Sequence, residues 1–267
     1  MFSNFYAFST FFVAVVVLNL ALMMFLGSKE LSARLFSLAA FFNFLWLFSV
    51  GSAYLLTDPT WAAFAARSTC STGLITVWAL LFCSITYSEK KIFSRNMKIL
   101  LFFGIFVVLF LVYAKDILSL FGAPFDSWIK EQTIVSETFP TNYGYVGWYF
   151  GSLMGVWSMI FYGVSGAFVA TLYQKFDHQT DPLLRKQALF MFLSMVVAIS
   201  PAFLFNVMFP IMGNFRFFWL GGILSLGWVS ILGYSIIKQG QMKVRTVTAE
   251  LLVVALILIM FIGMFAV

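Results

Sequence analysis

The stretch FYAFSTFFVAVVVLNLALMMFL, residues Phe5–Leu26, determines the class of this protein. It is 22 residues long and contains no charged side chain. A helix needs about 20 predominantly apolar residues to cross the hydrocarbon core of a bilayer. A secretory signal peptide would begin with basic residues, but the first Lys or Arg is Lys29, beyond the stretch. The stretch therefore predicts a retained membrane-spanning helix.

Seven further apolar stretches follow, and short polar breaks separate most of them. A β-barrel would show shorter segments of alternating polarity, so helices are the expected structure. The composition agrees, because 62% of the residues are apolar and 10% are charged, against about 25% charged in a soluble domain. We expect an all-α, polytopic transmembrane helix bundle. The seven stretches are Leu31–Leu56, Ala62–Tyr87, Ile99–Leu120, Val146–Tyr173, Ala188–Phe209, Phe217–Ile237 and Leu251–Val267.

The basic residues are distributed unevenly between the two sides of the predicted bundle. Twelve of the sixteen fall on the side reached after the first helix, and four fall on the other side. Cytoplasmic loops carry an excess of Lys and Arg, so we expect the N-terminus outside and Lys238 in the cytoplasm. The same distribution explains the net charge of +6 without a nucleic acid partner. The four outer basic residues are Arg67, Lys115, Lys130 and Arg216.

One long connection, from about Lys115 to Tyr145, is predicted to lie outside. Long loops in compact proteins are often lids or binding segments. Two interpretations stay open for Asp126–Phe139. This segment forms either a short interfacial helix anchored by Trp128 or an ordered loop without a function of its own.

The sequence contains no arrangement of residues typical of an enzyme. The single histidine, His178, has no Cys or second His beside it, so we predict neither a metal site nor a cofactor. P-loop and kinase-type Gly-rich motifs are missing, as are an HExxH motif and a pair of intramembrane aspartates. Cys70 and Cys83 fall in one apolar stretch and are expected to be buried thiols. We therefore predict that this chain has no catalytic activity.

Charged residues inside the predicted helices are costly in lipid, so each is a candidate for function. Arg67 lies near the outer end of its helix, where it either snorkels to the interface or lines an external pocket. We treat this pocket as the candidate site for an external ligand. Its candidate residues are Trp61, Arg67, Trp148 and Arg216.

Other residues are predicted to shape the packing of the helices. Gly147, Gly151 and Gly155 recur every four residues and form a small-residue face, which either packs within the bundle or makes a homodimer. Pro201 predicts a kink in the sixth helix. Three intramembrane amides are expected to hydrogen-bond across the bundle, namely Asn19, Asn43 and Asn206.

Several degenerate segments, spread over nearly the whole chain, share features with one family. Asn19 precedes a short turn and then the segment Arg34–Leu38, while Trp61–Arg67 is an Ala-rich helix opening that ends in an arginine. The other segments are Arg185–Gln187, Pro201, Gly233–Lys238 and Thr248–Leu252. Together these segments resemble the N-terminal seven-transmembrane sensor region of bacterial membrane histidine kinases.

The resemblance implies a sensor in the bacterial plasma membrane, surrounded by lipids, that receives an external or membrane-borne signal. It would relay the signal to a cytoplasmic kinase or response module in a longer or neighbouring chain. The phosphoacceptor His box and the ATP-binding segment of the family are missing from this sequence. Two alternatives stay open: a small transporter or permease, and a structural or assembly subunit.

Two parts of the chain are predicted to differ in their role. Residues 1–240 are expected to form the seven-helix sensor domain, and residues 241–267 an additional helix. The last stretch, Leu251–Val267, would reach about 26 Å as a helix, barely one hydrocarbon thickness. It has no polar anchor at its end, so we expect the chain to be either a piece of a longer polypeptide or a gene product cut short.

Overall fold

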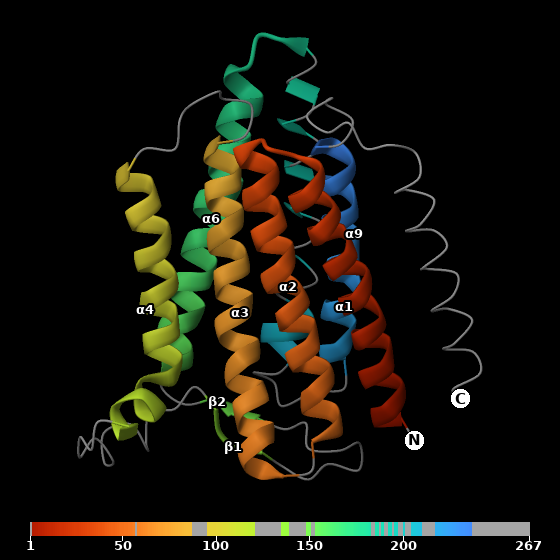
Figure 1. Ribbon diagram of the computed structural model, residues 1–267, viewed down its shortest axis with the longest axis vertical. Helices are drawn as coiled ribbons and strands as arrows, with labels where there is room; N and C mark the ends of the chain where they lie inside the picture. Colours follow the sequence, from red (N-terminus) through yellow and green to blue (C-terminus); the bar gives the residue numbers. More distant parts are fainter. Residues whose placement is uncertain are drawn as a thin grey trace.

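The computed structural model describes most of the first 120 residues and parts of the remainder. Within these residues the chain is helical apart from one pair of short strands (Figure 1). The described residues are 2–56, 58–86, 95–120, 135–138, 148–150, 153–182, 185–186, 188–189, 192–193, 195–196, 200, 204–209 and 217–236.

The first three helices form one antiparallel group (Figure 1). They are α1 (Phe2–Gly27), α2 (Leu31–Leu55) and α3 (Pro59–Thr86), and connections of three residues join them. Connections this short place consecutive helices side by side and antiparallel. α2 packs against both of its neighbours in the sequence, so the three helices form a continuous layer.

The later helices pack around this layer. α4 (Arg95–Leu120) and α6 (Leu153–His178) both lie against α3, whereas α9 (Phe218–Ile236) lies against α1 and α2. α3 is therefore enclosed by α2, α4 and α6. The enclosure shows in its burial, because 72% of its most apolar window is buried, against 44% for α1.

A short antiparallel pair, β1 (Val135–Thr138) and β2 (Trp148–Phe150), contacts α3. The pair lies near the lower end of α3 in Figure 1. One of the two expectations for this loop was an interfacial helix over Asp126–Phe139. The part of it that the structure describes, Val135–Thr138, instead forms the strand β1. Pairing satisfies backbone groups that an isolated turn of helix would leave open. Residues 126–134 lie outside the described part of the chain.

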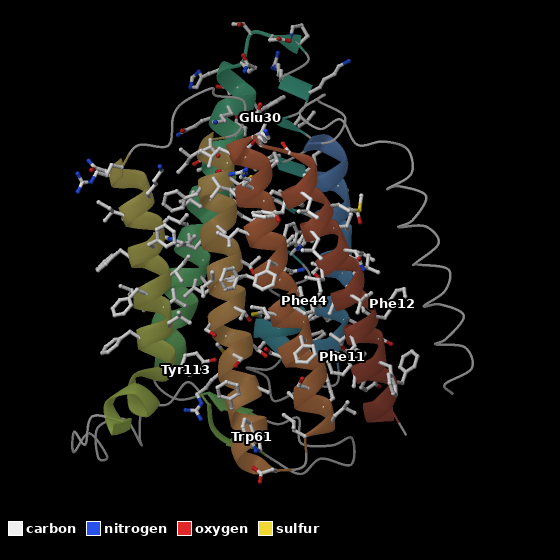
Figure 2. The ribbon with its side chains drawn as sticks, viewed as in Figure 1. Phe11, Phe12, Glu30, Phe44, Trp61 and Tyr113 are labelled. Carbon is white, nitrogen blue, oxygen red and sulfur yellow. The ribbon has the colours of Figure 1, made fainter. Side chains whose placement is uncertain are left out.

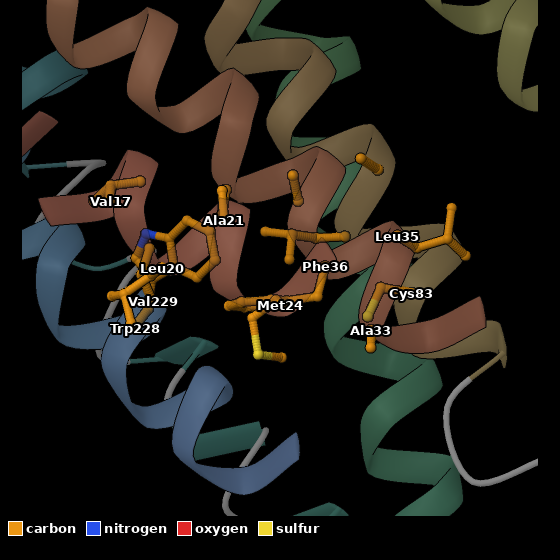
Figure 3. Close-up of a cluster of buried hydrophobic side chains, with 14 of the residues drawn as sticks. Val17, Leu20, Ala21, Met24, Ala33, Leu35, Phe36, Cys83, Trp228 and Val229 are labelled. Carbon is orange, nitrogen blue, oxygen red and sulfur yellow. The ribbon is translucent and has the colours of Figure 1, made fainter. Parts of the chain in front are cut away.

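The main core lies between α1, α2, α3 and α9, as Figure 3 shows. Phe36 of α2 is fully buried, and its ring meets Trp228 of α9 edge to face, with the centroids 6.3 Å apart. Lipid tails are as apolar as leucine, so close packing and hydrogen bonds, not escape from water, hold such helices together. The α1 side chains in this core are Val13, Ala14, Val16, Val17, Leu20, Ala21 and Met24.

Two contacts show how the helices approach each other. Ser37 Oγ of α2 donates a hydrogen bond to the Ala21 carbonyl of α1 at 2.6 Å. Trp78 Nε1 of α3 donates to the Leu101 carbonyl of α4 at 3.2 Å. The Trp78 ring lies so close over Gly104 that a Cβ there would overlap it. A glycine therefore sets the distance between α3 and α4.

The helices follow the predicted apolar stretches closely. Three helical segments are long and apolar enough to cross a membrane, namely Phe5–Gly27, Leu31–Leu55 and Arg67–Thr86. α4 and α9 contain shorter apolar segments, Lys98–Phe110 and Leu220–Ile231. The prediction of a helical chain with membrane-type helices is confirmed at this level. The eighth predicted stretch, Leu251–Val267, lies outside the described residues.

The structure differs from the prediction at the start of the fifth stretch. This region was expected to be helical throughout, but Trp148–Phe150 forms β2 and α6 begins at Leu153. Aromatic residues favour strands when a partner strand is at hand. Gly155 falls within α6, whereas Gly147 and Gly151 precede it and lie outside the described residues. The predicted small-residue face therefore lies mostly outside the described part of the chain.

The sixth predicted stretch contains a π-helical turn, η1 (Leu204–Met208), which packs against α9. Pro201 lies outside the described residues, and η1 begins three positions after it. Proline removes one backbone hydrogen bond from a helix, and π-helical turns occur where the ladder is interrupted. The irregular turn thus falls in the segment for which the kink was predicted.

Candidate functional site

The two ends of the bundle differ in chemistry, and Glu30 and Trp61 mark them in Figure 2. The Glu30 end holds the α1–α2 connection and the start of α4; the Trp61 end holds the start of α3 and the part of α4 that carries Tyr113. Most basic residues of the described chain belong to the Glu30 end. They are Lys29, Arg34, Arg95, Lys98, Lys175, Arg185 and Lys186.

The start of α3 is fixed by its own sequence. Asp58 Oδ1 accepts a hydrogen bond from the backbone N–H of Trp61 at 3.2 Å, which is the geometry of a helix N-cap. Pro59 follows at the first helical position, where its missing N–H costs nothing. The helix therefore begins at a defined residue, and this fixes the direction of the side chains that follow.

Hydroxyl side chains crowd the N-terminal half of α3, and most of them bond within the helix. Thr69 Oγ1 donates to the Ala65 carbonyl at 3.0 Å, and Thr72 Oγ1 donates to the Ser68 carbonyl at 2.6 Å. Thr76 repeats the pattern one turn later. Such bonds let a buried helix carry hydroxyls without a partner on another helix.

Two other hydroxyls of α3 meet α4. The Tyr113 hydroxyl lies 2.7 Å from Ser68 Oγ and 3.5 Å from Ser71 Oγ. Ser71 Oγ also donates to the Ser68 carbonyl at 3.1 Å. We call Ser68, Ser71 and Tyr113 the hydroxyl cluster. It joins α3 to α4 near the Trp61 end, as Trp78 does further along the same two helices.

Two aromatic side chains, Phe64 and Trp61, lie between the hydroxyl cluster and the N-terminal end of α3. The Phe64 ring lies 5.9 Å from the Tyr113 ring and 6.1 Å from the Trp61 ring, centroid to centroid. Trp61 is 61% exposed and Phe64 is 46% exposed. Exposed aromatic side chains at the end of an apolar helix are typical of the membrane–water interface.

Arg67 lies on the same face of α3. At about 100° per residue, positions 61, 64, 67, 68 and 71 fall within an arc of roughly 120°. Arg67 is partly exposed and is the only charged residue between Pro59 and Thr86. This face therefore combines a cation, hydroxyl donors and aromatic rings. A guanidinium beside hydroxyls can bind a carboxylate or phosphate through several hydrogen bonds.

The structure describes only some of the four predicted ligand-site residues. Trp61 and Arg67 share the α3 face described above. Trp148 lies in β2 opposite Thr138 of β1, and β1 contacts α3, although the Trp148 side chain is outside the described part. Arg216 is also outside it.

Sequence reasoning missed the hydroxyl cluster. The signal that could have found it was the run Ser68–Thr72 directly after Arg67, together with Tyr113 as a polar position late in an aromatic-rich helix.

Two of the predicted amides bond in different ways. Asn43 Nδ2 of α2 donates to Ser225 Oγ of α9 at 3.2 Å, and both residues are buried. This bond crosses the bundle. Asn19 instead donates to the Val15 carbonyl of its own helix at 2.8 Å and is exposed. The prediction that Asn19 bonds across the bundle is therefore wrong, because its side chain lies on an exposed face of α1.

The third amide, Asn206, lies in η1 and presses on Gly221 of α9, where any Cβ would overlap the carboxamide. Its Oδ1 is buried and has no hydrogen-bond partner among the described residues. A buried acceptor without a donor costs about 1–3 kcal/mol. The π-helical turn is thus a place where the bundle holds an unfavourable polar group.

The Glu30 end carries a second set of interhelical bonds. Lys175 Nζ of α6 donates to the Ile85 carbonyl in the last turn of α3 at 2.9 Å. A cation there satisfies a carbonyl without an intrahelical partner and complements the helix dipole. Cys83 Sγ donates to the Ser32 carbonyl of α2 at 3.4 Å. The C-terminal end of α3 is therefore held by α6 and α2.

His178 ends α6 and is exposed. Within the described residues, no three His, Cys, Asp or Glu side chains come together as metal ligands would. The strongest candidate site is therefore the α3 face with Arg67 and the hydroxyl cluster. No protein-family model matches the chain, and no curated protein matches its sequence.

Proposed function

We propose that this chain is the membrane-embedded sensor region of a two-component-type signalling protein in the bacterial plasma membrane. In this proposal residues 1–240 form the seven-helix sensor, and residues 241–267 add a further helix. The signal arrives at the Trp61 end, from outside or from the lipid. A cytoplasmic kinase or response module in a longer or neighbouring chain receives the output.

The position of α3 is the observation that carries the proposal. One end of this helix bears Arg67 and the hydroxyl cluster, and its last turn at the other end is held by Lys175. α3 also contacts α2, α4, α6 and β1. A helix engaged at both ends can relay a shift if the signal has different affinity for two arrangements of the bundle.

The distribution of charge supports the proposed sidedness. With Lys and Arg concentrated at the Glu30 end, that end faces the cytoplasm under the positive-inside rule. The face with Arg67 then lies toward the outside, where an external ligand or an outer-leaflet lipid can reach it. Lys175 and the end of α3 lie toward the output module.

The proposal is tested by fusing the chain, after Lys238, to a histidine kinase core and measuring autophosphorylation in membrane vesicles. Removing an interhelical hydroxyl bond by Tyr113→Phe should change the phosphorylation rate by about threefold. That estimate follows from roughly 0.6 kcal/mol per interhelical hydrogen bond in a membrane. Ser68→Ala should shift the rate in the same direction.

Thr171→Ala is the matched control, because Thr171 Oγ1 bonds only to the Ala167 carbonyl of its own helix in α6 and is partly exposed. It removes a hydroxyl that does not bond to α3 and should leave the rate unchanged. A kinase rate that is equal in all four proteins, with each correctly inserted, would argue against the sensor role.

A transporter or permease is the second candidate, and η1 favours it. Transporters bind their substrates at interrupted helices near the middle of the bilayer. η1 is such an interruption, and it carries the buried Asn206 Oδ1. Uptake of a radiolabelled solute into liposomes by the purified chain, abolished by Asn206→Leu, would support this candidate over the sensor.

A further inference from the structure

An exposed aromatic strip extends from the hydroxyl cluster along α4. Phe102, Phe106, Phe110 and Tyr113 follow one another at spacings of four, four and three residues, so they share one side of the helix. The three phenylalanines are 69%, 65% and 41% exposed, and the exposed fraction falls toward Tyr113. Phe106 and Phe110 stack with their centroids 6.4 Å apart.

The strip and the α3 face meet at Tyr113. On one side Tyr113 contacts Ser68 and Phe64, which belong to the face that carries Arg67. On the other side the strip leads along α4 toward the middle of the bundle. A polar group at the end of an apolar helix, continued by an apolar surface at membrane depth, has the shape of a lipid: headgroup first, acyl chain beyond.

We propose that this combined surface binds an anionic phospholipid. Its phosphate would meet the Arg67 guanidinium and whichever hydroxyl of the Ser68–Tyr113 pair does not donate in the bond between them. Its acyl chains would lie on Phe110 and Phe106, with Trp61 at the headgroup level.

Three features support this occupant. The charge is complementary, because the single charged residue of α3 is the cation Arg67 and its side chain is partly exposed. Guanidinium and hydroxyl groups together match the tetrahedral arrangement of phosphate oxygens. A soluble anion would leave the exposed aromatic strip unused, whereas the acyl chains of a phospholipid can lie on it.

If the bound lipid acts as the signal, the sensor responds to the lipid composition of the leaflet. This consequence rests on the proposed function. The binding itself is tested without any kinase. The full chain is reconstituted in phosphatidylcholine vesicles that contain increasing fractions of brominated phosphatidylglycerol or brominated phosphatidylcholine. Quenching of tryptophan fluorescence then measures the relative association of each lipid, and Trp61→Phe identifies the part of the signal that comes from this surface.

Brominated phosphatidylglycerol should quench the Trp61 component with a relative association constant about fivefold above that of brominated phosphatidylcholine. Arg67→Gln should bring the ratio close to one. Arg34→Gln is the matched control, because it removes one charge at the Glu30 end, where Arg34 lies 6.0 Å from the Phe25 ring. It should leave the ratio unchanged.

Equal quenching of the Trp61 component by the two lipids in the unmodified chain would overturn the proposal. Full displacement of phosphatidylglycerol by an equal fraction of oleate would also overturn it, since the surface would then select single-chain acids. If Arg67→Gln fails to insert, Tyr113→Phe and Arg67→Lys provide the test, and both should lower the ratio without abolishing it. A silent kinase fusion with lipid selectivity intact would refute only the signalling role.

Discussion

Helices α3 and α4 lie side by side but differ in burial and in polarity. α3 is surrounded by α2, α4, α6 and β1, and several of its hydroxyl residues are buried, among them Thr69, Ser71 and Thr76. α4 has α3 as its principal neighbour among the described elements, and it presents a row of phenylalanines outward. The more polar helix is thus the more buried one, which is the reverse of a soluble protein.

The difference follows from the solvent. In a bilayer an apolar side chain gains little by leaving the lipid, whereas a hydroxyl gains a hydrogen bond by facing another helix or its own backbone. Polar residues therefore mark the interior of such a bundle, and large apolar residues can mark its outside. The contrast between Phe82 of α3, at 2% exposed, and Phe106 of α4, at 65%, makes this testable.

The largest effect is expected from truncating Phe82. Phe82→Ala should lower the free energy of unfolding by about 3 kcal/mol, because it leaves a cavity among packed side chains. Phe106→Ala, the matched change on α4, should alter it by less than about 0.5 kcal/mol. Unfolding by sodium dodecyl sulfate, followed by circular dichroism, measures both. Equal losses would mean that the α4 face is covered by protein, and the comparison would fail.

The next effect concerns the distance between the two helices. Gly104→Ala should destabilise the chain by about 1–3 kcal/mol, because the new methyl group overlaps the Trp78 ring and pushes α4 outward. Gly163→Ala of α6 is the control, since a Cβ there meets nothing within 4 Å, and it should be neutral or slightly stabilising. The buried thiols Cys70 and Cys83 report unfolding through a thiol-reactive dye. The contact is refuted if both alanines give the same melting temperature.

Removing the hydroxyl of Tyr113 sharpens the comparison at the Trp61 end. Tyr113→Phe should cost about 0.6–1 kcal/mol, because it deletes the bond to Ser68 while leaving the ring contact with Phe64. The double variant with Ser68→Ala should cost little more than either single change. Additive losses in the dodecyl sulfate titration would show that the two hydroxyls act independently.

The smallest effect is expected at the Glu30 end of α3. Lys175→Met keeps much of the side-chain length but removes the hydrogen bond to the Ile85 carbonyl, so a loss of about 0.5–1 kcal/mol is expected. Lys186→Met, exposed and beyond the end of α6, is the control. Hydrogen exchange of the last turn of α3 should rise in the first variant alone. Unchanged hydrogen exchange in both variants would show that Lys175 does not stabilise the end of α3.

The helices themselves could be predicted from the sequence. Apolar runs such as Leu31–Leu56 have the length of a spanning helix, and the observed α2 ends within one residue of that range. The three-residue connections and the cap at Asp58 and Pro59 are likewise local signals. Local propensity failed at Trp148–Phe150, where pairing with a strand distant in the sequence decided the outcome.

The site could be predicted only in part. Arg67 and Trp61 stand out in an apolar stretch because each is unusual there. The run Ser68–Thr72 marks this part of α3 as polar, but it does not single out Ser68 and Ser71, since most serines in such helices bond to their own backbone. Only the rotation of α3 relative to α4, which no single helix encodes, brings Tyr113 to them. The same reason explains Asn43 and Asn19: their residue type is identical, and their direction in the bundle separates them.

The three-residue connections between α1, α2 and α3 have a consequence for biogenesis. These helices leave the ribosome consecutively, and the contacts between α1 and α2 and between α2 and α3 join segments that are close in sequence. Contacts of this kind form early, before the distant α9 has been synthesised. We expect the first three helices to assemble in the bilayer as a nascent unit onto which later helices dock. Errors in α4 or α9 would then leave an inserted but incomplete protein, a form that membrane quality-control proteases could recognise.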